Sequence, residues 1–486
     1  MRSLVMLNVP GPRPFPVLGA SGNLLRFIRD PLGYIGRLFD AYGPIAVLVR
    51  GRPTRIVSTE ASAPGTVFFY GAELNRELLT AHEKFHKSAL SGPLYPQEPV
   101  NARKRPLKRL LTGLFHVNGD EHRQQRRLMM PAFHKSRIDS YRDDMVALTE
   151  SMLAGFSAGE TRDLRPDMME LTLRVATKTL FGGDMGQAGL QVARKLQLWL
   201  ELFRPSAMLP LDVPGTPYRR WLDTSLAIDA KMSEVIAEKR RAASSGADIL
   251  SMLLEAKDEQ GASLSDDELV GHVGVIFAAG YETTSNALSW TLFLLSQHPR
   301  VANDLLDELD SVLHGDAPRV EQLAELPLLE RVIKESMRLL PPVPLNHRVA
   351  PAETELGGYT LPAGTEVISS IYHTHRIPEL YSEPARFRPE RWEKFDPGPY
   401  AYNPFSAGPR MCIGAAFAML ELKIVLAVLL QRFRFELVPG IRVDRFFSIT
   451  MSPKPGLKMR VHTQDHRFDD SARNVRGNIR EMVHLD

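Results

Sequence analysis

One cysteine in a chain of 486 residues stands in a segment that suggests metal binding. Cys412 lies between Gly408 and Gly414, and Arg410 precedes it by two residues. A lone thiol cannot form an internal disulfide, and a zinc site usually draws several clustered sulfur or nitrogen ligands, which this segment lacks. A single thiolate can instead hold haem iron from one side and favour cleavage of dioxygen. The glycines would let the backbone turn tightly and direct its amides at the sulfur.

The run from Phe405 to Gly414 resembles the haem-binding loop of the cytochrome P450 family at all five fixed positions, which are Phe405, Gly408, Arg410, Cys412 and Gly414. The resemblance implies haem b as cofactor, with Cys412 as the axial thiolate and Phe405 and Arg410 among the cofactor-binding residues. An isolated cysteine is more often a small buried side chain. That alternative does not explain the surrounding pattern.

A second motif places a carboxylate and hydroxyl groups in the middle of an apolar helix. The segment Ala279–Ser285 resembles the oxygen-activation motif of the same family. Gly280 leaves room beside the haem, and the hydroxyl of Thr283 can bond the carbonyl of Ala279 and locally open the helix. Because dioxygen reduction consumes protons, we expect Glu282 to deliver them and Thr283 to position water. The alternative, a polar patch that faces solvent, fits poorly with the apolar neighbours.

A third motif predicts a buried group of charges. Glu335 and Arg338 are three residues apart and share one helical face. Alone, such a pair is most often a solvated ion pair. The segment Phe387–Trp392 resembles the meander of the family, which implies that Arg391 completes a structural triad with Glu335 and Arg338. Loss of one member would leave buried charge unpaired at a cost of about 3–5 kcal/mol.

Further basic residues are candidates for the haem propionates. The segment Gly119–Arg127 resembles the helix that usually carries Trp-x-x-x-Arg in this family, with His122 in the place of the tryptophan and Arg126 in the place of the arginine. Arg348 and Arg410 complete the expected cationic set. A surface histidine is the alternative for His122.

The substrate pocket is expected to be apolar, which favours a hydrophobic small molecule such as a fatty acid, terpenoid, steroid or polyketide. An apolar lining does not distinguish among these classes. The expected lining residues are Leu114, Phe115, Phe277, Ala278, Val343, Leu345 and Ile449.

The motifs require a mainly α fold with small β-sheets, in which the haem lies between a long central helix and the cysteine loop. The central helix is expected to begin after a capping box of Ser265 and Glu268 and to end at His298, before Pro299. His272 and Glu282 interrupt its apolar run, so a transmembrane helix is excluded. Other segments are predicted as helical (120–173), as short strands (45–58 and 357–370) and as a long loop (91–116).

Composition sets the outer limits. The 60 basic and 57 acidic residues give a net charge of +3, too balanced to indicate nucleic acid as a partner. The apolar run in residues 1–9 is too short for a signal peptide or a bilayer span. We therefore expect a cytoplasmic monomer with no membrane anchor. Residues 1–462 are predicted to form the catalytic domain and residues 463–486 a polar C-terminal tail.

Together these features predict a haem-thiolate monooxygenase that hydroxylates or epoxidises its substrate with dioxygen. Its electrons would come from a ferredoxin and its reductase, or from a flavodoxin. Four arginines would either form a basic docking face for that donor or be ordinary solvated surface residues. Two alternatives are a peroxide-driven or isomerising haem enzyme and a non-enzymatic haem sensor. Both fit the Glu282–Thr283 pair less well. The four arginines are Arg123, Arg127, Arg432 and Arg434.

Overall fold

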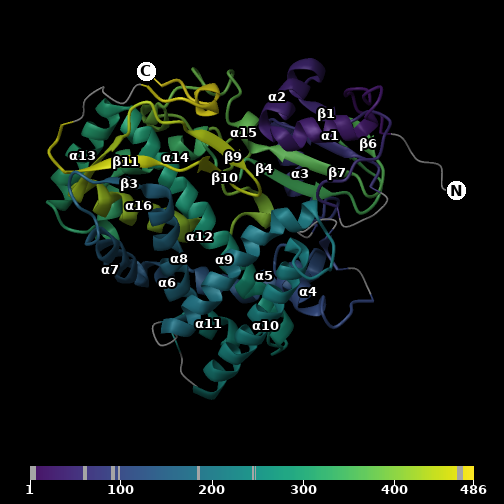
Figure 1. The fold of residues 1–486 in the computed structure, drawn as a ribbon, viewed down its shortest axis with the longest axis horizontal. Coiled ribbons are helices and arrows are strands. Elements are labelled where there is room, and N and C mark those ends of the chain that lie inside the picture. Colours follow the sequence, from purple (N-terminus) through teal and green to yellow (C-terminus); the bar gives the residue numbers. More distant parts are fainter. Residues whose placement is uncertain are drawn as a thin grey trace.

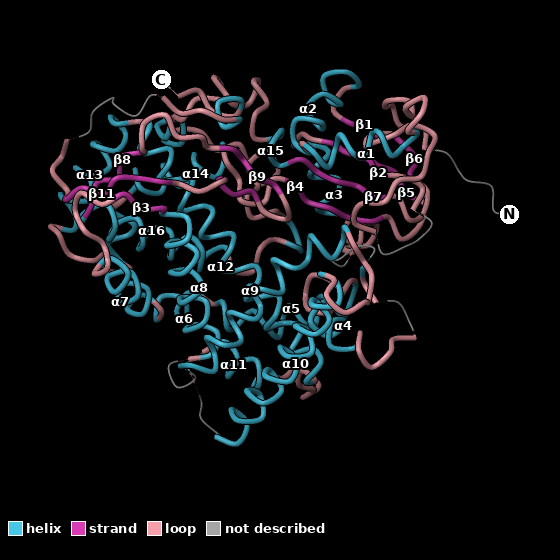
Figure 2. The backbone as a smooth tube through the Cα atoms, in the orientation of Figure 1, coloured by secondary structure: helices cyan, strands magenta, loops and turns pink. Residues whose placement is uncertain are grey.

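Helices form most of the molecule, and short strands lie along one side of it (Figures 1 and 2). The computed structural model describes residues 7–58, 63–88, 94–96, 99–182, 186–242, 246, 248–467 and 474–485. The predicted mainly α architecture with small sheets is confirmed. None of the helices that the structure describes is both long and apolar enough to cross a membrane.

The helices pack in several directions around one long central member, α12. Their bounds are α1 (Gly19–Arg29), α2 (Pro31–Tyr42), α3 (Ala72–Thr80), α4 (Arg105–Leu111), α5 (Gly119–Met129), α6 (Lys135–Ser140), α7 (Arg142–Leu153), α8 (Leu164–Phe181), α9 (Gly186–Met208), α10 (Pro217–Ala242), α11 (Ile249–Glu255), α12 (Asp266–Gln297), α13 (Pro299–Leu313), α14 (Pro327–Leu339), α15 (Ile371–Thr374) and α16 (Ala415–Arg432).

The strands form a four-stranded sheet in the order β1-β2-β7-β4, a three-stranded sheet in the order β3-β11-β8, and the pairs β5-β6 and β9-β10. All pairings are antiparallel except that of β2 with β7, in which Thr66 lies opposite Glu366. The strands are β1 (Ile45–Val47), β2 (Thr66–Phe69), β3 (Thr161–Asp163), β4 (Leu345–Val349), β5 (Thr354–Leu356), β6 (Tyr359–Leu361), β7 (Glu366–Ser370), β8 (Phe433–Leu437), β9 (Asp444–Phe447), β10 (Met451–Lys454) and β11 (Lys458–Thr463).

The central helix α12 begins and ends where its sequence predicts. Ser265 and Glu268 form the capping box, and Pro299 opens the next helix. Its 32 residues span about 48 Å at 1.5 Å per residue. Helix α8 packs along it, and Thr172 donates a hydrogen bond to the carbonyl oxygen of Tyr281 at 2.9 Å. Most of α12 is therefore buried.

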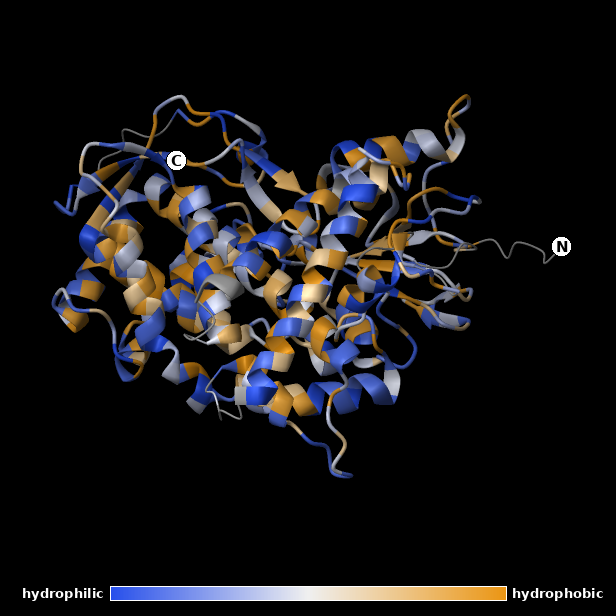
Figure 3. Ribbon diagram, turned by 60° about the horizontal axis from the view of Figure 1, so that its bottom comes forward, coloured by the Kyte–Doolittle hydropathy of each residue, from blue (hydrophilic) through white to orange (hydrophobic). Residues whose placement is uncertain are grey.

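Two large apolar clusters meet at α12. The cluster around its N-terminal half draws on α4, α8, α9, α10 and α11. The cluster around its C-terminal half draws on α14, α16 and the sheet of β8 and β11. Figure 3 shows apolar and polar residues on the same helices, as expected for elements that bury one side and expose the other. The fold therefore holds α12 firmly at both ends.

Three predicted segments differ in the structure. The stretch 120–173, predicted as helical, contains the strand β3 at Thr161–Asp163. The second part of the predicted strand region is not a strand, because Ile56 and Val57 donate their backbone N–H groups to the buried carboxylate of Glu366 at 2.9 and 2.7 Å instead of to a neighbouring strand. The expected loop 91–116 contains α4, whose Leu107, Leu110 and Leu111 are buried at helical spacing. Residues 91–93 and 97–98 of that loop lie outside the described residues.

The C-terminal segment, expected to be a polar tail, contributes apolar side chains to the main core. Val475, Ile479, Met482 and Val483 are buried in the cluster around the C-terminal half of α12. The segment is also bound through its backbone, since Val443 donates to the carbonyl of Arg476 at 2.8 Å. The domain boundary after residue 462 stays a prediction.

Replacement of Ile479 tests whether this segment stabilises the protein. Ile479 has no exposed surface, so Ile479→Ala should lower the free energy of unfolding by about 2–5 kcal/mol through lost burial and a cavity. Leu25, which is 59% exposed on α1, provides the control, and Leu25→Ala should change stability by less than about 0.5 kcal/mol. Chemical denaturation followed by circular dichroism measures both. Equal stability of the two variants would contradict a role for the segment.

A buried histidine on α12 predicts how stability depends on pH. Within the described residues, neither ring nitrogen of His272 has a hydrogen-bond partner. Burial lowers the pKa of His272 from 6.5 to about 4, against the opposing effect of Glu268. Between these values the unfolded chain binds a proton that the folded protein does not, so stability should fall as the pH falls through this window.

The slope of the unfolding free energy against pH should be smaller in His272→Leu than in wild type in this window. The difference corresponds to the uptake of up to one proton on unfolding, or about 1.4 kcal/mol per pH unit. Denaturant titrations of both proteins at a series of pH values would measure the two slopes. Identical slopes would show that His272 does not titrate differently in the folded and unfolded states.

Candidate active site

The cysteine loop connects a 3-10 turn, Gly408–Arg410, to the start of α16. The backbone N–H of Cys412 donates to the carbonyl oxygen of Phe405 at 2.9 Å, which closes the loop. The side chain of Cys412 is solvent accessible, yet surrounding protein raises the pKa of the thiol, while the N–H of Gly414 and the charge of Arg126 act to lower it. A side chain that is both accessible and deep within the protein lines an internal space.

Gly408 brings this loop against α3. Its φ of +69° lies in the left-handed region, and a Cβ atom at this position would come within 2.5 Å of the carbonyl oxygen of Leu79. Only glycine meets both conditions without strain. The glycine of the motif is thus required by the packing of the loop.

A face of α12 in the middle of its length is open. Thr283 donates to the carbonyl oxygen of Ala279 at 2.6 Å, the contact expected from the sequence. A Cβ atom added at Gly280 would meet no atom within 4 Å. Such open space in a helix that is otherwise mostly buried fits a bound group beside it. The partly exposed residues are Val275, Ile276, Ala278, Ala279, Gly280, Glu282 and Thr283.

Glu282 is bound by a residue that the sequence did not reveal. Thr450, in the turn between β9 and β10, donates its hydroxyl to Oε1 of Glu282 at 2.7 Å. Asn286 donates from Nδ2 to the same hydroxyl oxygen at 3.1 Å. The polar Asn286, four residues after Glu282 in a buried helix, could have indicated that Glu282 has a polar partner. Thr450 lies 168 residues away in sequence and carried none.

Four cations, Lys87, Arg126, Arg348 and Arg410, form what we call the cation cluster; Arg348 is buried and the other three are half-buried. Burial, and then the charge of Arg410, lower the pKa of Arg348 to about 9. Burial, and then the charge of Arg126, lower the pKa of Arg410 to about 10. The pKa of Lys87 is lowered by burial and by Arg348 and Arg410. The charge of at least one other cluster member therefore lowers the pKa of Lys87, of Arg348 and of Arg410.

Neutral oxygens accept the hydrogen bonds of Lys87, Arg348 and Arg410. Arg348 donates to Oδ1 of Asn346 at 2.7 Å and Lys87 donates to the same atom at 2.9 Å. Arg410 donates to the carbonyl of Val117 at 2.6 Å and to Oδ1 of Asn118 at 2.7 Å. In the part of the chain that the structure describes, no carboxylate pairs with the cluster. Buried cations without anions are costly, so the cluster fits an anionic ligand such as the two propionates of haem.

His122 fits the same ligand as a neutral donor. It is buried, and its Nδ1 has no hydrogen-bond partner among the residues described. Burial, followed by the charges of Arg410 and Arg126, lowers its pKa from 6.5 to about 3. The cluster residue Lys87 was missed by sequence reasoning, because nothing in the surrounding residues distinguishes it from a surface lysine.

The predicted triad forms one buried network. Arg338 binds Glu335 through two bonds of 2.8 and 2.9 Å, and Arg391 binds it at 2.9 Å. The indole of Trp392 adds a fourth bond, at 2.9 Å, that the sequence did not predict. Burial raises the pKa of Glu335, but the hydrogen bond and charge of Arg338 and the charge of Arg391 lower it below its ordinary value. Arg338 also donates to the carbonyl oxygens of His375 and Pro384.

The expected pocket residues do not all face the same space. Phe277 has no exposed surface and packs against Tyr281, with ring centroids 5.2 Å apart. It lies two residues from Val275 and from Ala279, a rotation of about 200° on a helix, so it points away from the open face. Leu114 is buried. The half-buried candidates are Phe115, Ala278, Val343, Leu345 and Ile449.

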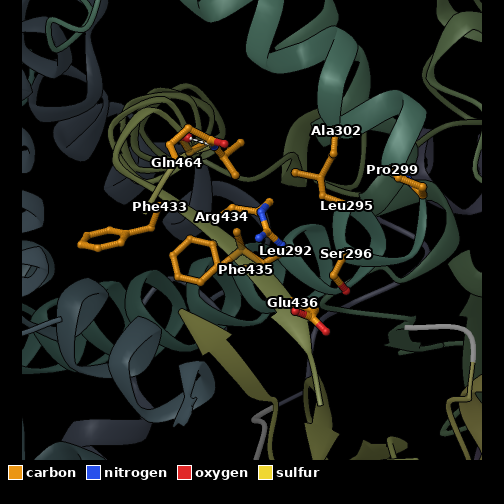
Figure 4. Close-up of a pocket in the computed structure, with 11 residues that line it drawn as sticks. Leu292, Leu295, Ser296, Pro299, Ala302, Phe433, Arg434, Phe435, Glu436 and Gln464 are labelled. Atoms are coloured by element: carbon orange, nitrogen blue, oxygen red, sulfur yellow. Dashed lines mark hydrogen bonds between the residues drawn. The ribbon is translucent and has the colours of Figure 1, made fainter. Parts of the chain in front are cut away.

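A small apolar pocket lies elsewhere, between the end of α12 and β8 (Figure 4). Leu292 and Leu295 line it, at least twelve residues and about 18 Å along the helix from Gly280. Its volume of about 40 Å³ admits only a few water molecules. This pocket is too small and too distant to bind the substrate of the site.

The expected basic docking face is not supported. Within the described residues each of its four arginines meets an acidic partner, so their charges are locally offset. Arg434, for example, binds Asp465 at 2.7 Å and is largely buried. The pairs are Arg123 with Glu83 and Asp120, Arg127 with Glu259, Arg432 with Glu150, and Arg434 with Asp465.

The cation cluster predicts opposite effects of one substitution in ligand-free and haem-loaded protein. Arg348→Met removes a buried charge, while Oδ1 of Asn346 keeps its bond from Lys87. The haem-free protein should therefore melt at a higher temperature than wild type, whereas the haem-loaded protein should release haem faster. Thermal melts of both forms and haem transfer to apomyoglobin measure these effects. Exposed Arg29 is the control, and Arg29→Met should change neither. A similar loss of stability in both forms of Arg348→Met would contradict the prediction.

Comparison with known proteins agrees with this site. The sequence model described as Cytochrome P450 matches residues 9–459. The chain is 35% identical to cyclooctat-9-en-7-ol 5-monooxygenase of Streptomyces melanosporofaciens over 75% of this chain and 82% of that protein. It is 29% identical to pentalenene oxygenase of Streptomyces avermitilis over 93% and 96% of the two chains.

A solved cyanobacterial P450 with retinoic acid bound is similar in structure, with a TM-score of 0.79 and 26% identity over 94% of this chain and 99% of that one. The family match extends over nearly the whole sequence and includes the cysteine loop, the central helix and the buried triad. The chain therefore belongs to the cytochrome P450 family and is a monooxygenase with haem b as its cofactor.

Proposed function

We propose that this P450 inserts one oxygen atom into a cyclic terpenoid, by hydroxylation or epoxidation. Two relatives bear the names of terpene-oxygenating enzymes, cyclooctat-9-en-7-ol 5-monooxygenase and pentalenene oxygenase. The observation that carries the proposal is the open face of α12, where Glu282 and Thr283 are the polar groups among apolar residues. An apolar space with few polar groups suits a hydrocarbon-rich substrate.

We assign the cofactor contacts as follows. Cys412, the only cysteine of the chain, would be the axial ligand. The cation cluster and the neutral ring of His122 would bind the propionates, and the anionic ligand would offset the buried positive charge. Phe405 and Gly280 would lie against the macrocycle. When bound, haem supplies the activation of dioxygen.

The roles of Glu282 and Thr283 follow from their hydrogen bonds. Thr283 donates its hydroxyl hydrogen to the carbonyl oxygen of Ala279. The hydroxyl oxygen can therefore take part in a further hydrogen bond only as an acceptor. It would therefore orient a water molecule that donates to it. Glu282 accepts from Thr450 through Oε1, and Oε2 has no partner in the described structure. That second oxygen would exchange protons with the water held by Thr283.

We propose that the electrons come from a ferredoxin and its reductase, or from a flavodoxin. Iron–sulfur clusters need several cysteine ligands, and this sequence has a single cysteine. The chain therefore cannot hold such a cluster itself. Because the arginines of the expected docking face are paired with acids, the binding surface for the donor is left unassigned.

The substrate class is tested by optical titration of the haem-loaded protein with terpenes, fatty acids, steroids and macrolides. A terpene that enters the site should displace water and shift the ferric iron from low to high spin in a saturable way. Turnover with ferredoxin, reductase and NADPH should then give a product heavier by one oxygen atom. Saturable shifts with fatty acids alone would exclude the terpenoid proposal.

Cys412→Ser tests the assigned iron ligand. The variant should lose the thiolate spectrum of the ferrous carbon monoxide complex, because an alcohol does not replace a thiolate. Thr450→Ser, which changes a residue far from the iron ligand in sequence, serves as the spectral control. An unchanged spectrum of Cys412→Ser would contradict the assignment.

A further inference from the structure

Three residues of α12, spaced four apart, bind the turn between β9 and β10 and the first residue of β10. Glu282 accepts from Thr450 at 2.7 Å, Asn286 donates to Thr450 at 3.1 Å, and Trp290 donates from Nε1 to the carbonyl oxygen of Met451 at 3.0 Å. Residues at this spacing form one row along a helix. The turn is therefore attached along the same side of α12 that carries Glu282.

The hydrogen bonds fix the direction of the Thr450 hydroxyl. A hydroxyl has one hydrogen to donate and two lone pairs to accept. Because its oxygen accepts from Asn286, its hydrogen is directed to Oε1 of Glu282. Asn286 has no exposed surface and Thr450 is 6% exposed, so water competes little for these bonds. Hydrogen bonds to a carboxylate in such surroundings are strong.

The backbone around Thr450 is held on both sides. The N–H of Met451 donates to the carbonyl of Pro342 at 2.8 Å. On the preceding strand, the N–H of Arg445 donates to Oδ1 of Asn478 at 2.7 Å, which joins β9 to the C-terminal segment. Thr450 thus presents its hydroxyl from a fixed position. Ile449, half-buried and a candidate pocket residue, is its neighbour in the turn.

We propose that Thr450 is a positioning residue for the reaction, which fixes one oxygen of Glu282 so that the other can exchange protons. This inference rests on the proton-delivery role proposed for Glu282. Without the Thr450 hydroxyl, the half-buried carboxylate can rotate about its side-chain bonds. Proton delivery then competes poorly with release of reduced oxygen as peroxide, so electrons are consumed without product.

Thr450→Val tests the proposal, since valine keeps the branched shape and removes the donor. The haem-loaded variant and haem-loaded wild type are compared with the same substrate, the terpene that gives the largest spin shift in the titration above. Pentalenene is the first terpene to titrate. Product formed per NADPH consumed should fall about tenfold, the cost of one hydrogen bond to a charged group. Peroxide formation and the solvent isotope effect on turnover should rise, while the affinity from the spin shift stays within about twofold.

Thr450→Ser is the matched control, because it retains the hydroxyl and should restore coupled turnover. A purely structural role would instead lower the melting temperature of Thr450→Val without a change in isotope effect. If Thr450→Val does not retain haem, Thr450→Ala takes its place in the same measurements.

A double-mutant cycle with Glu282→Gln separates this inference from the proposed function. If Thr450 acts through Glu282, Thr450→Val should have little further effect when Glu282 is already glutamine. If Glu282→Gln lowers coupling but Thr450→Val does not, or if the two effects simply add, the positioning role is overturned and the proton role of Glu282 stands. If Glu282→Gln turns over as wild type does, both are overturned.

Discussion

The site depends on one constraint: among the described residues, its buried and half-buried positive charges have no carboxylate partner. Burial lowers the pKa of all four members of the cation cluster, and the charge of another member lowers it further in Lys87, Arg348 and Arg410. Neutral side-chain and backbone oxygens bind these three but do not cancel their charge. We propose that the propionates of haem offset this positive charge, so that residues that would weaken the ligand-free protein would strengthen its complex.

Elsewhere in the fold, the buried charge of Glu335 is paired and hydrogen-bonded. Around Glu335 the two arginines share a carboxylate, and both oxygens of that carboxylate accept bonds from Arg338, Arg391, Trp392 or the backbone of Arg388. Arg338 extends this network to the carbonyls that precede the cysteine loop. Hydrogen bonds of this kind give directional rigidity, which apolar packing alone does not. The network thus supports the backbone at His375 and Pro384.

Local patterns predicted the elements whose contacts are close in sequence. The capping box of α12, its end before Pro299 and the bond from Thr283 to Ala279 all involve residues within four positions of one another. Thr450 and Trp392 escaped prediction because their contacts join segments far apart in the chain. Phe277 shows a different limit: its neighbourhood was identified, but the rotation of the helix about its axis depends on the packing of Tyr281 against the surrounding helices. The roles of the site residues themselves stay predictions.

The C-terminal segment has a consequence for how the protein is made. Ile479 and Met482 belong to the same apolar cluster as residues of α7 and α8, more than 300 positions earlier. During synthesis those early helices leave the ribosome long before the residues that complete their core. The cluster can close only after residues 479–483 have been translated, so the early helices must wait with apolar surface uncovered. Nascent chains in this state are exposed to aggregation and proteolysis.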